Sequence, residues 1–242
     1  MANSQTRPHA VIVGASSGLG AGCAKRLSGS YNITGLSRRG LLPDGLPDES
    51  SLALVCDATS PDALTTCLDK AVNSFGKISL MIVTAGKHLI KPARTVKEKE
   101  VHALFEANIA LPVFASSLFA SKRFTHVDAV LCLVSSIAAY RPEAGIVLYG
   151  ATKAATSALV AGLAKELAPR RVVGVSPSWL DTPMTQASPH IYTPNFVKEI
   201  KLRSPLGLVN IEDVLDGIEF LISAKAKMIT GQVLVIDGGV SL

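Results

Sequence analysis

A tyrosine and a lysine one helical turn apart could carry out proton transfer in this chain. Tyr149 and Lys153 lie four positions apart in a stretch with a helical pattern, so both side chains would share one helix face. A lysine ammonium beside a phenol favours the phenolate and lowers the phenol pKa, which makes the phenol a usable proton donor near neutral pH. A solvent-exposed helix face shows the same spacing, so the surrounding elements must distinguish the two interpretations.

Two serines at the end of a predicted strand could serve the same reaction. The apolar run 129–134 ends in Ser135 and Ser136, and a helix is predicted over residues 148–168. A serine hydroxyl can hold the oxygen that receives the proton. Together these residues predict a site that moves a proton on or off a carbinol oxygen.

A glycine-rich turn near the N-terminus predicts a phosphate-binding loop. The predicted strand 9–13 runs into Gly14, and Gly18 and Gly20 open a helical pattern that continues to Leu27. Gly14 permits the tight turn, Gly18 lets the backbone approach a phosphate, and Gly20 lets the helix pack on the strand, with the anion at the positive helix N-terminus. The spacing is Gly-x-x-x-Gly-x-Gly rather than Gly-x-Gly-x-x-Gly, and a glycine-rich loop without a ligand is the alternative.

The end of the second predicted strand, residues 31–37, indicates which dinucleotide would bind. Arg38 and Arg39 follow it directly, and no acidic residue stands there. An acidic residue at this position binds the ribose 2′-hydroxyl, whereas arginine accommodates a 2′-phosphate. We therefore expect NADP(H) rather than NAD(H); the alternative is that both arginines are solvated loop charges.

The remaining pattern predicts one α/β domain over residues 1–242. Ser60-Pro61 opens a helix, Thr95 and Glu98 have the spacing of a capping box, and Asn210 caps a helix. The alternation of strands and helices, without a repeat or linker, predicts a Rossmann fold: a doubly wound parallel sheet of about seven strands with helices on both faces. Residues 183–208 are irregular and proline-containing, which predicts a substrate lid. Further strands are expected at residues 52–56, 80–83, 129–134, 171–175 and 233–236.

Composition excludes several classes of protein. The chain is 48% hydrophobic and 18% charged, with a net charge of +5, which favours a well-buried globular protein. No dense Lys/Arg tract with interleaved aromatics predicts nucleic-acid binding, and neither a signal peptide nor an apolar run near the length of a membrane span is expected. The four cysteines show no metal-ligand spacing, so we expect reduced packing residues, no metal, and a cytoplasmic protein.

Taken in order, the motifs resemble the short-chain dehydrogenase/reductase superfamily over residues 9–239. The family's Thr-Gly-x-x-x-Gly-x-Gly appears at residues 13–20, and its Asn-Asn-Ala-Gly becomes Val-Thr-Ala-Gly at residues 83–86. The resemblance implies a catalytic tetrad, with the serine thirteen residues before the tyrosine, of Asn108, Ser136, Tyr149 and Lys153. It also implies that the asparagine holds a water linking the lysine to solvent.

The same resemblance implies the ligand-binding residues. One aspartate, Asp57, would touch the adenine amine, Thr182 would anchor the nicotinamide amide, and Ser178 replaces the glycine that usually follows Pro177. The cofactor set is Gly14, Ser16, Ser17, Gly18, Leu19, Gly20, Ser37, Arg38, Arg39, Asp57, Ala58, Ala85, Gly86, Tyr149, Lys153, Pro177 and Thr182. The substrate set is Ser136, Tyr149, Ser178, Trp179 and Tyr192, although the two large rings could instead only pack the lid.

Within the family the chain most resembles the FabG-like 3-oxoacyl-[acyl-carrier-protein] reductases, in length and in residues 149–155. This implies an NADPH-dependent ketoreductase that acts on a 3-oxoacyl or polyketide thioester carried by an acidic acyl carrier protein. The basic residues expected to dock the carrier, or else to be ordinary charges at helix ends, are Lys122, Arg123, Arg170 and Arg171. The alternatives are a reductase or dehydrogenase of a free ketone or secondary alcohol, and a non-catalytic NADP-binding regulator or assembly subunit. A homotetramer or homodimer through helices near residues 100–122 and 150–168 is also implied.

Overall fold

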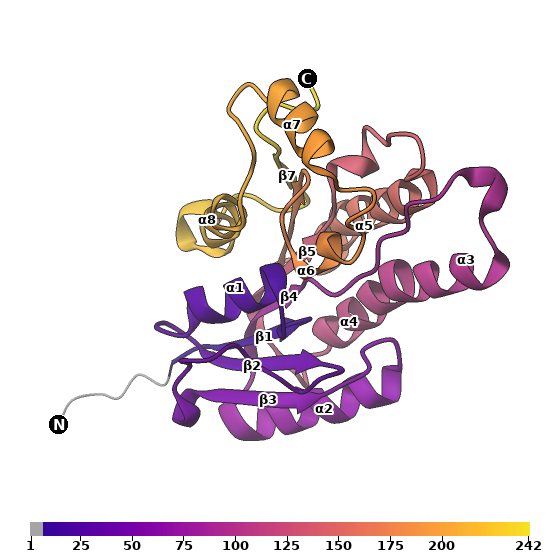
Figure 1. The fold of residues 1–242 in the computed structure, drawn as a ribbon. Coiled ribbons are helices and arrows are strands. Elements are labelled where there is room, and N and C mark those ends of the chain that lie inside the picture. The colour runs from indigo at the N-terminus through magenta and orange to yellow at the C-terminus, as the bar shows by residue number, and fades with distance from the viewer. Residues whose placement is uncertain (1–6) are drawn as a thin grey trace.

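Seven parallel strands form the centre of the structure, a computed structural model that describes residues 7–242 (Figure 1). Their spatial order is β3-β2-β1-β4-β5-β6-β7, so the chain starts in the middle of the sheet and winds outward in both directions. This confirms the predicted doubly wound Rossmann sheet. The strands are β1 His9–Val13, β2 Asn32–Ser37, β3 Ser51–Val55, β4 Ile78–Val83, β5 Thr125–Val134, β6 Arg171–Pro177 and β7 Val233–Ile236.

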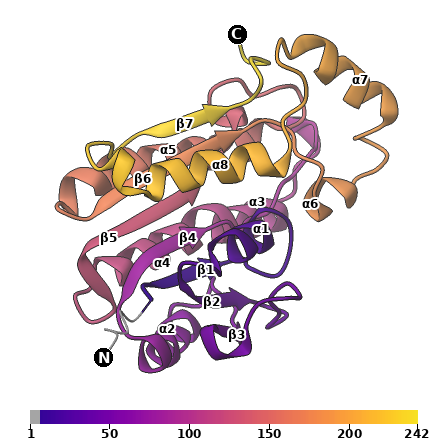
Figure 2. The same cartoon turned by 90° about the vertical axis from the view of Figure 1, so that its left-hand side faces the viewer.

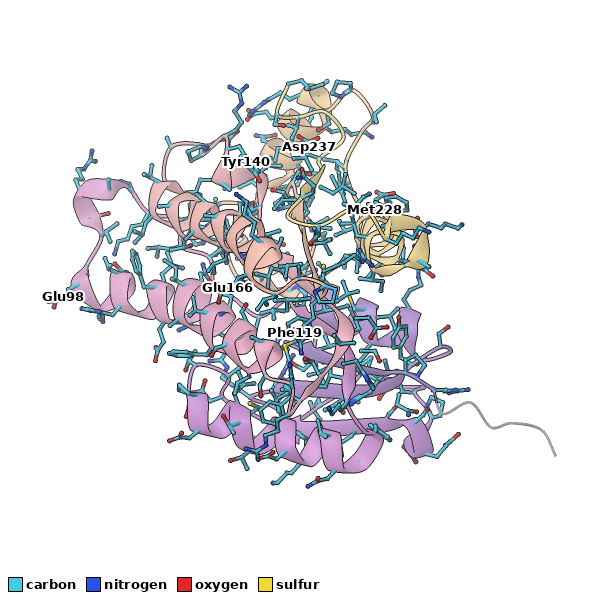
Figure 3. All side chains as sticks on the ribbon, turned by 180° about the vertical axis from the view of Figure 1, so that it is seen from behind. Glu98, Phe119, Tyr140, Glu166, Met228 and Asp237 are labelled. Atoms are coloured by element: carbon cyan, nitrogen blue, oxygen red, sulfur yellow. The ribbon has the colours of Figure 1, made fainter. Side chains whose placement is uncertain are left out.

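The strands are almost wholly apolar because helices cover both faces of the sheet. On one face, α2 (Pro61–Phe75), α4 (Leu111–Ala120) and α5 (Val147–Glu166) contribute to a core that includes the fully buried Phe119 (Figure 3). On the other face, α1 (Gly18–Leu27) and α8 (Ile211–Ile222) form a second core. The chain thus has two hydrophobic layers with the sheet between them.

Two of the three predicted helix starts are confirmed. The Oγ atom of Ser60 accepts a hydrogen bond from the N–H of Ala63 at 3.3 Å, and Asn210 exchanges bonds of 3.0 and 2.8 Å with Asp213. The capping box at Thr95 is wrong, because its hydroxyl donates to the carbonyl of Pro92 and closes the 3-10 turn Ala93–Thr95. Helix α3 (Glu98–Phe105) begins only after residue 97.

Two helical stretches, Glu98–Ala120 and Val147–Glu166, are long and apolar enough by length and composition to cross a membrane. This corrects the expectation that no apolar run approaches that length. Both stretches lie against the sheet and contribute to its core. Core helices of ordinary domains satisfy the same criterion, so these two are explained by their place in the fold.

The predicted lid, residues 183–208, contains two helices rather than a mainly irregular chain. They are α6 (Pro183–Gln186) and α7 (Pro194–Arg203), and neither has a buried residue. Figure 2 shows both beyond the carboxyl ends of the strands, apart from the two core layers. This segment therefore depends on a few specific contacts rather than on a hydrophobic core.

Candidate active site

One cavity of about 1130 Å³ lies at the carboxyl ends of the strands. It includes the ends of β1 and β4, where the strand order reverses and where doubly wound sheets bind ligands. Every residue of the predicted cofactor and substrate sets lines it. Of the predicted tetrad, only Asn108 does not.

The glycine-rich turn fits a bound phosphate. Gly14 has a φ of +101°, and a Cβ there would lie 2.7 Å from the backbone nitrogen of Ala85. A Cβ on Gly20 would collide with the carbonyl oxygen of Gly14, so strand and helix approach too closely for side chains. Ser17 makes no side-chain cap at the start of α1, which leaves first-turn N–H groups available to an anion.

Thr84 braces the end of β4 in place of the family's asparagine. Its Oγ1 atom donates to the carbonyl oxygens of Val13 at 3.1 Å and Gly14 at 3.3 Å. These bonds join β4 to β1 and to the glycine-rich turn. Sequence reasoning missed this role, although the position beside Ala85-Gly86 was a signal for it.

The basic residues after β2 differ in what they contact. Arg39 donates through Nη2 to the carbonyl oxygen and Oγ of Ser16, both at 2.9 Å, and so holds the glycine-rich turn. Arg38 is exposed on the cavity wall and makes no side-chain hydrogen bond or ion pair within residues 7–242. Hydrogen bonds from Thr59, followed by the nearby Arg38 and Lys87 charges, lower the pKa of Asp57. β2 itself carries no carboxylate at this corner of the cavity.

Tyr149 and Lys153 lie one turn apart on α5 and line the cavity, as predicted. The Nζ atom of Lys153 donates to the carbonyl of Val134 at 2.8 Å and lies 5.8 Å from the centre of the Tyr149 ring. Burial lowers the pKa of Lys153 to about 8. Burial also raises the pKa of Tyr149 to about 12; a hydrogen bond with Ser136 opposes this rise, and the nearby Tyr192 adds to it.

The expectation that Lys153 brings the pKa of the phenol below its ordinary value is therefore wrong for this structure. The side-chain nitrogen of Lys153 donates to a backbone carbonyl rather than to the phenol. The rise in the phenol pKa that burial causes is larger than the lowering caused by any neighbouring group. The phenol is consequently protonated at neutral pH. That is the state from which a group can donate a proton.

The two serines after β5 have different environments. Ser135 is buried and donates through Oγ to the carbonyl of Lys153 at 2.9 Å, and the same atom lies 2.8 Å from Oγ of Ser157. Ser136 lines the cavity, and its Oγ accepts a 3.2 Å bond from the N–H of Ala138. The hydroxyl of Ser136 therefore faces Tyr149 within the cavity, whereas Ser135 positions α5.

Asn108 lies in a π-helical turn, Glu106–Ala110, and is 1% exposed. Its side-chain amide bonds the N–H and carbonyl of Lys87, both at 2.8 Å, and donates to Oγ1 of Thr152 at 3.0 Å. It is thus buried and braces the loop after β4, and its side chain does not line the main cavity. A separate cavity of about 10 Å³, about the size of one water, is lined by residues that include Asn108, Lys153 and Thr156.

Four rings gather over the substrate end of the cavity. Tyr192 lies 6.2 Å from Trp179, 5.1 Å from Phe196 and 6.2 Å from His88, measured between ring centres. His88 and Phe196 were missed by sequence reasoning. The signal for Phe196 was its spacing with Ile200 and Arg203, which places all three on one face of α7 and against the cavity.

The basic residues expected to dock a carrier protein lie at the wrong edge of the sheet. Arg170 is 8% exposed and donates through Nε to Oγ1 of Thr125 and the carbonyl of His126. Arg171 donates to backbone carbonyls at the end of α8, Leu221 at 2.7 Å and Ile222 at 3.1 Å.

Lys122 and Arg123 precede β5 at that same edge, and Arg123 pairs with Asp69. Because all strands are parallel, residues that precede a strand lie a whole strand length from the site, about 20 Å for the seven residues of β6. None of the four basic residues lines the cavity.

The fold and the cavity define a Rossmann-type oxidoreductase, and comparisons with known proteins agree. A family model described as enoyl-(acyl carrier protein) reductase matches residues 14–241. The 3-oxoacyl-[acyl-carrier-protein] reductase FabG of Buchnera aphidicola is 26% identical, over 97% of both chains. The 4-formylbenzenesulfonate dehydrogenase of Comamonas testosteroni is 30% identical, over 95% of this chain and 96% of that dehydrogenase.

A solved structure gives the same result. The crystal structure of 3-ketoacyl-(acyl-carrier-protein) reductase from Brucella melitensis complexed with NADH is 27% identical and superposes with a TM-score of 0.85. The superposition covers 97% of this chain and 98% of that one. The chain therefore belongs to the short-chain dehydrogenase/reductase superfamily and is similar to its FabG-like members.

Proposed function

We propose that the protein is an NADPH-dependent ketoreductase. The observation that carries the proposal is one continuous cavity, with a phosphate-binding turn and Arg38 at one end and Tyr149, Lys153 and Ser136 at the other. A bound nicotinamide dinucleotide would supply the hydride that reaches the carbonyl carbon. The protein's own residues position both reactants and handle the proton.

The cofactor would be held by groups along the cavity. First-turn N–H groups of α1 would bind the pyrophosphate, Arg38 would bind the 2′-phosphate, and Asp57 would accept from the adenine amine. Thr182, the N-cap of α6, would hold the nicotinamide amide, and Lys153 would hold the nicotinamide ribose. Arg39 contributes by fixing the turn through Ser16.

The proton would come from Tyr149. Its phenol, protonated at neutral pH, donates to the carbonyl oxygen while the hydroxyl of Ser136 donates a hydrogen bond to the same oxygen. Lys153, whose pKa is about 8, is mostly an ammonium at pH 7 and stabilises the phenolate that results. A water in the small cavity beside Asn108 would connect Lys153 to further proton donors.

The first substrate candidate is the 3-oxo group of an acyl or polyketide thioester on an acyl carrier protein. The FabG proteins of Buchnera aphidicola and Thermotoga maritima support it, at 26% and 28% identity. The second candidate is a free ketone or secondary alcohol. The four basic residues at the far edge of the sheet favour this second candidate, because they cannot contact a carrier seated at the cavity mouth.

The assembly and compartment belong to the same proposal. We expect a homotetramer or homodimer through two helical stretches, the one that runs from α3 through α4 and the one formed by α5. Phe105 of α3, Val113 of α4 and Val147 of α5 are exposed apolar residues on these stretches. We expect a reducing compartment such as the cytoplasm, because all four cysteines are buried free thiols.

The test is a comparison of cofactors and of carriers. Purified protein is titrated with NADPH and NADH, and NADPH oxidation is then followed with an acetoacetyl thioester, either on an acyl carrier protein or on a small thiol. NADPH-selective oxidation supports the ketoreductase, and activity only on the carrier-bound form selects the first substrate. Tight NADPH binding without oxidation of any carbonyl compound would contradict the reductase and favour a regulatory NADP-binding protein.

A further inference from the structure

A cluster of four rings, His88, Trp179, Tyr192 and Phe196, forms one wall of the cavity and is called here the ring cluster. Its members come from three separate segments: the loop after β4, the end of β6, and the predicted lid. Tyr192 is the centre, since it contacts each of the other three rings. Convergence from three segments makes the cluster a feature of the tertiary structure rather than of a local sequence pattern.

The rings meet in the orientations that aromatic groups prefer. Phe196 lies edge-on to Tyr192, with 5.1 Å between ring centres and 68° between planes, and edge-on to Trp179, at 6.3 Å and 72°. The other two contacts are tilted by 43° and 45° at 6.2 Å. Such arrangements are favoured by the ring quadrupole, and an additional ring can extend them in the same way.

The ring cluster lies next to the reaction centre. Tyr149 and all four rings line the same cavity, and Trp179 follows β6, which pairs with β5, the strand that ends just before Ser135 and Ser136. A group attached to the carbonyl that Tyr149 protonates would therefore contact Tyr192 and its neighbours.

The cluster is held in place over the cavity. Nη1 of Arg203, at the end of α7, pairs with Oε1 of Glu143 at 2.7 Å, which joins the predicted lid to the loop before α5. Trp179 contributes ring surface rather than a hydrogen bond, because its indole N–H is buried and has no partner within residues 7–242. These contacts present an ordered aromatic wall.

We propose that the substrate carries an aromatic ring on the reacting carbonyl carbon, and that this ring packs against the ring cluster. The inference rests on the proposed ketoreductase function and names the substrate class for it. A saturated ring of the same size buries similar apolar area but gains no edge-to-face interaction. The expected discrimination for an aryl over an alicyclic substrate is therefore about 2- to 10-fold.

The first test is a pair of ketones of nearly equal size, acetophenone and cyclohexyl methyl ketone, reduced by variants at one position. Tyr192→Phe keeps the ring, whereas Tyr192→Leu removes it, and both lack the hydroxyl. The ratio of kcat/KM for the two ketones should be the same in Tyr192→Phe as in the wild type and should move about 2- to 10-fold against acetophenone in Tyr192→Leu. Leu202→Ala, at a 78% exposed position on α7 that does not line the cavity, is the control and should not change the ratio.

The second test measures binding without turnover. Trp179 is the single tryptophan of the chain, so intrinsic fluorescence reports directly on the ring cluster. In the presence of NADP⁺, 1-phenylethanol should change this fluorescence at about 2- to 10-fold lower concentration than 1-cyclohexylethanol.

The two tests distinguish failure of the aryl inference from failure of the proposed reductase function. Reduction of both ketones with a ratio that Tyr192→Leu leaves unchanged would overturn the aryl inference while the reductase stands. If neither ketone is reduced, the proposed function is contradicted for these carbonyls, and the fluorescence titration alone decides the aryl preference. Fluorescence changes at equal concentrations of 1-phenylethanol and 1-cyclohexylethanol would overturn the aryl inference.

Discussion

Two arginine pairs that look alike in the sequence lie at opposite edges of the sheet. Arg38 and Arg39 follow β2 at the carboxyl edge, where one faces the cavity and the other holds the glycine-rich turn. Arg170 and Arg171 lie at the start of β6, at the amino edge, and donate to backbone and hydroxyl groups of the protein itself. The same residue type therefore lines the cavity at one edge and stabilises the fold at the other.

The difference extends to other polar groups. At the amino edge, the two ring nitrogens of the buried His9 lie 2.8 Å from the carbonyl of Gly76 and 2.9 Å from Oγ1 of Thr34. At the carboxyl edge, Lys153 is buried with one carbonyl partner and no carboxylate. Polar groups are thus paired internally where the fold needs stability and left incompletely paired where a ligand is expected, which lowers stability at the site.

The largest effect is expected at the carboxyl edge. Tyr149→Phe should lower kcat/KM about 10²- to 10⁴-fold, because it removes the proton donor and little else. NADPH affinity and thermal stability should remain close to the wild type, which fluorescence titration and thermal unfolding can measure. Normal turnover in this variant would remove Tyr149 from the mechanism.

At the amino edge, Arg171→Met should lower the free energy of unfolding by about 2–3 kcal/mol, because carbonyls at the end of α8 lose a charged donor. Urea denaturation measures the loss, and NADPH affinity should not change. Lys122→Met, an exposed neighbour at the same edge, is the control and should stay within about 0.5 kcal/mol of the wild type. If Arg171→Met instead lost NADPH affinity and kept its stability, Arg171 would serve the ligand rather than the fold.

Lys153→Met removes a residue of the proposed mechanism and yet should raise the free energy of unfolding at pH 7, by about 1–3 kcal/mol. The folded-state pKa of about 8 lies below the unfolded value near ~10.4, so the unfolded chain binds more protons between these limits. The free energy of unfolding of the wild type should therefore rise with pH through this window. The difference in free energy of unfolding between the variant and the wild type should shrink over the same range.

Denaturation at pH 7 and pH 10 measures the effect of Lys153→Met. Lys165→Met changes an exposed lysine on the same helix and should show no such pH dependence. A destabilised Lys153→Met variant at pH 7 would mean that the ammonium stabilises the fold, as the amino-edge cations do.

The smallest effect is expected at the cavity corner beside β2. Arg38→Ala should raise the Kd for NADPH about 10-fold and leave the Kd for NADH unchanged, because only the 2′-phosphate loses a charged partner. Arg141→Ala, another exposed arginine on the cavity wall, should change neither. Equal losses for both dinucleotides would remove Arg38 from cofactor selection.

Much of the fold could be predicted because short apolar runs between turn residues indicate buried parallel strands. The limits were within two residues for most strands, but β5 begins at Thr125 rather than at residue 129. Its first residues, which include the exposed Val127, do not read as buried strand. A local pattern also failed at Thr95, which was predicted to cap a helix. Its hydroxyl instead closes the 3-10 turn that precedes α3, and the helical pattern does not reveal that turn.

By itself the sequence determined the sheet, the order of the motifs, and their meeting at the carboxyl edge, because parallel strands bring successive strand ends together. Only the tertiary structure decided how each polar group is used. It showed that burial raises the pKa of Tyr149, that Asn108 braces a loop, and that Arg171 serves the fold. It also brought four rings together from three segments. Solvation and pairing depend on neighbours distant in the sequence, which a local pattern does not specify.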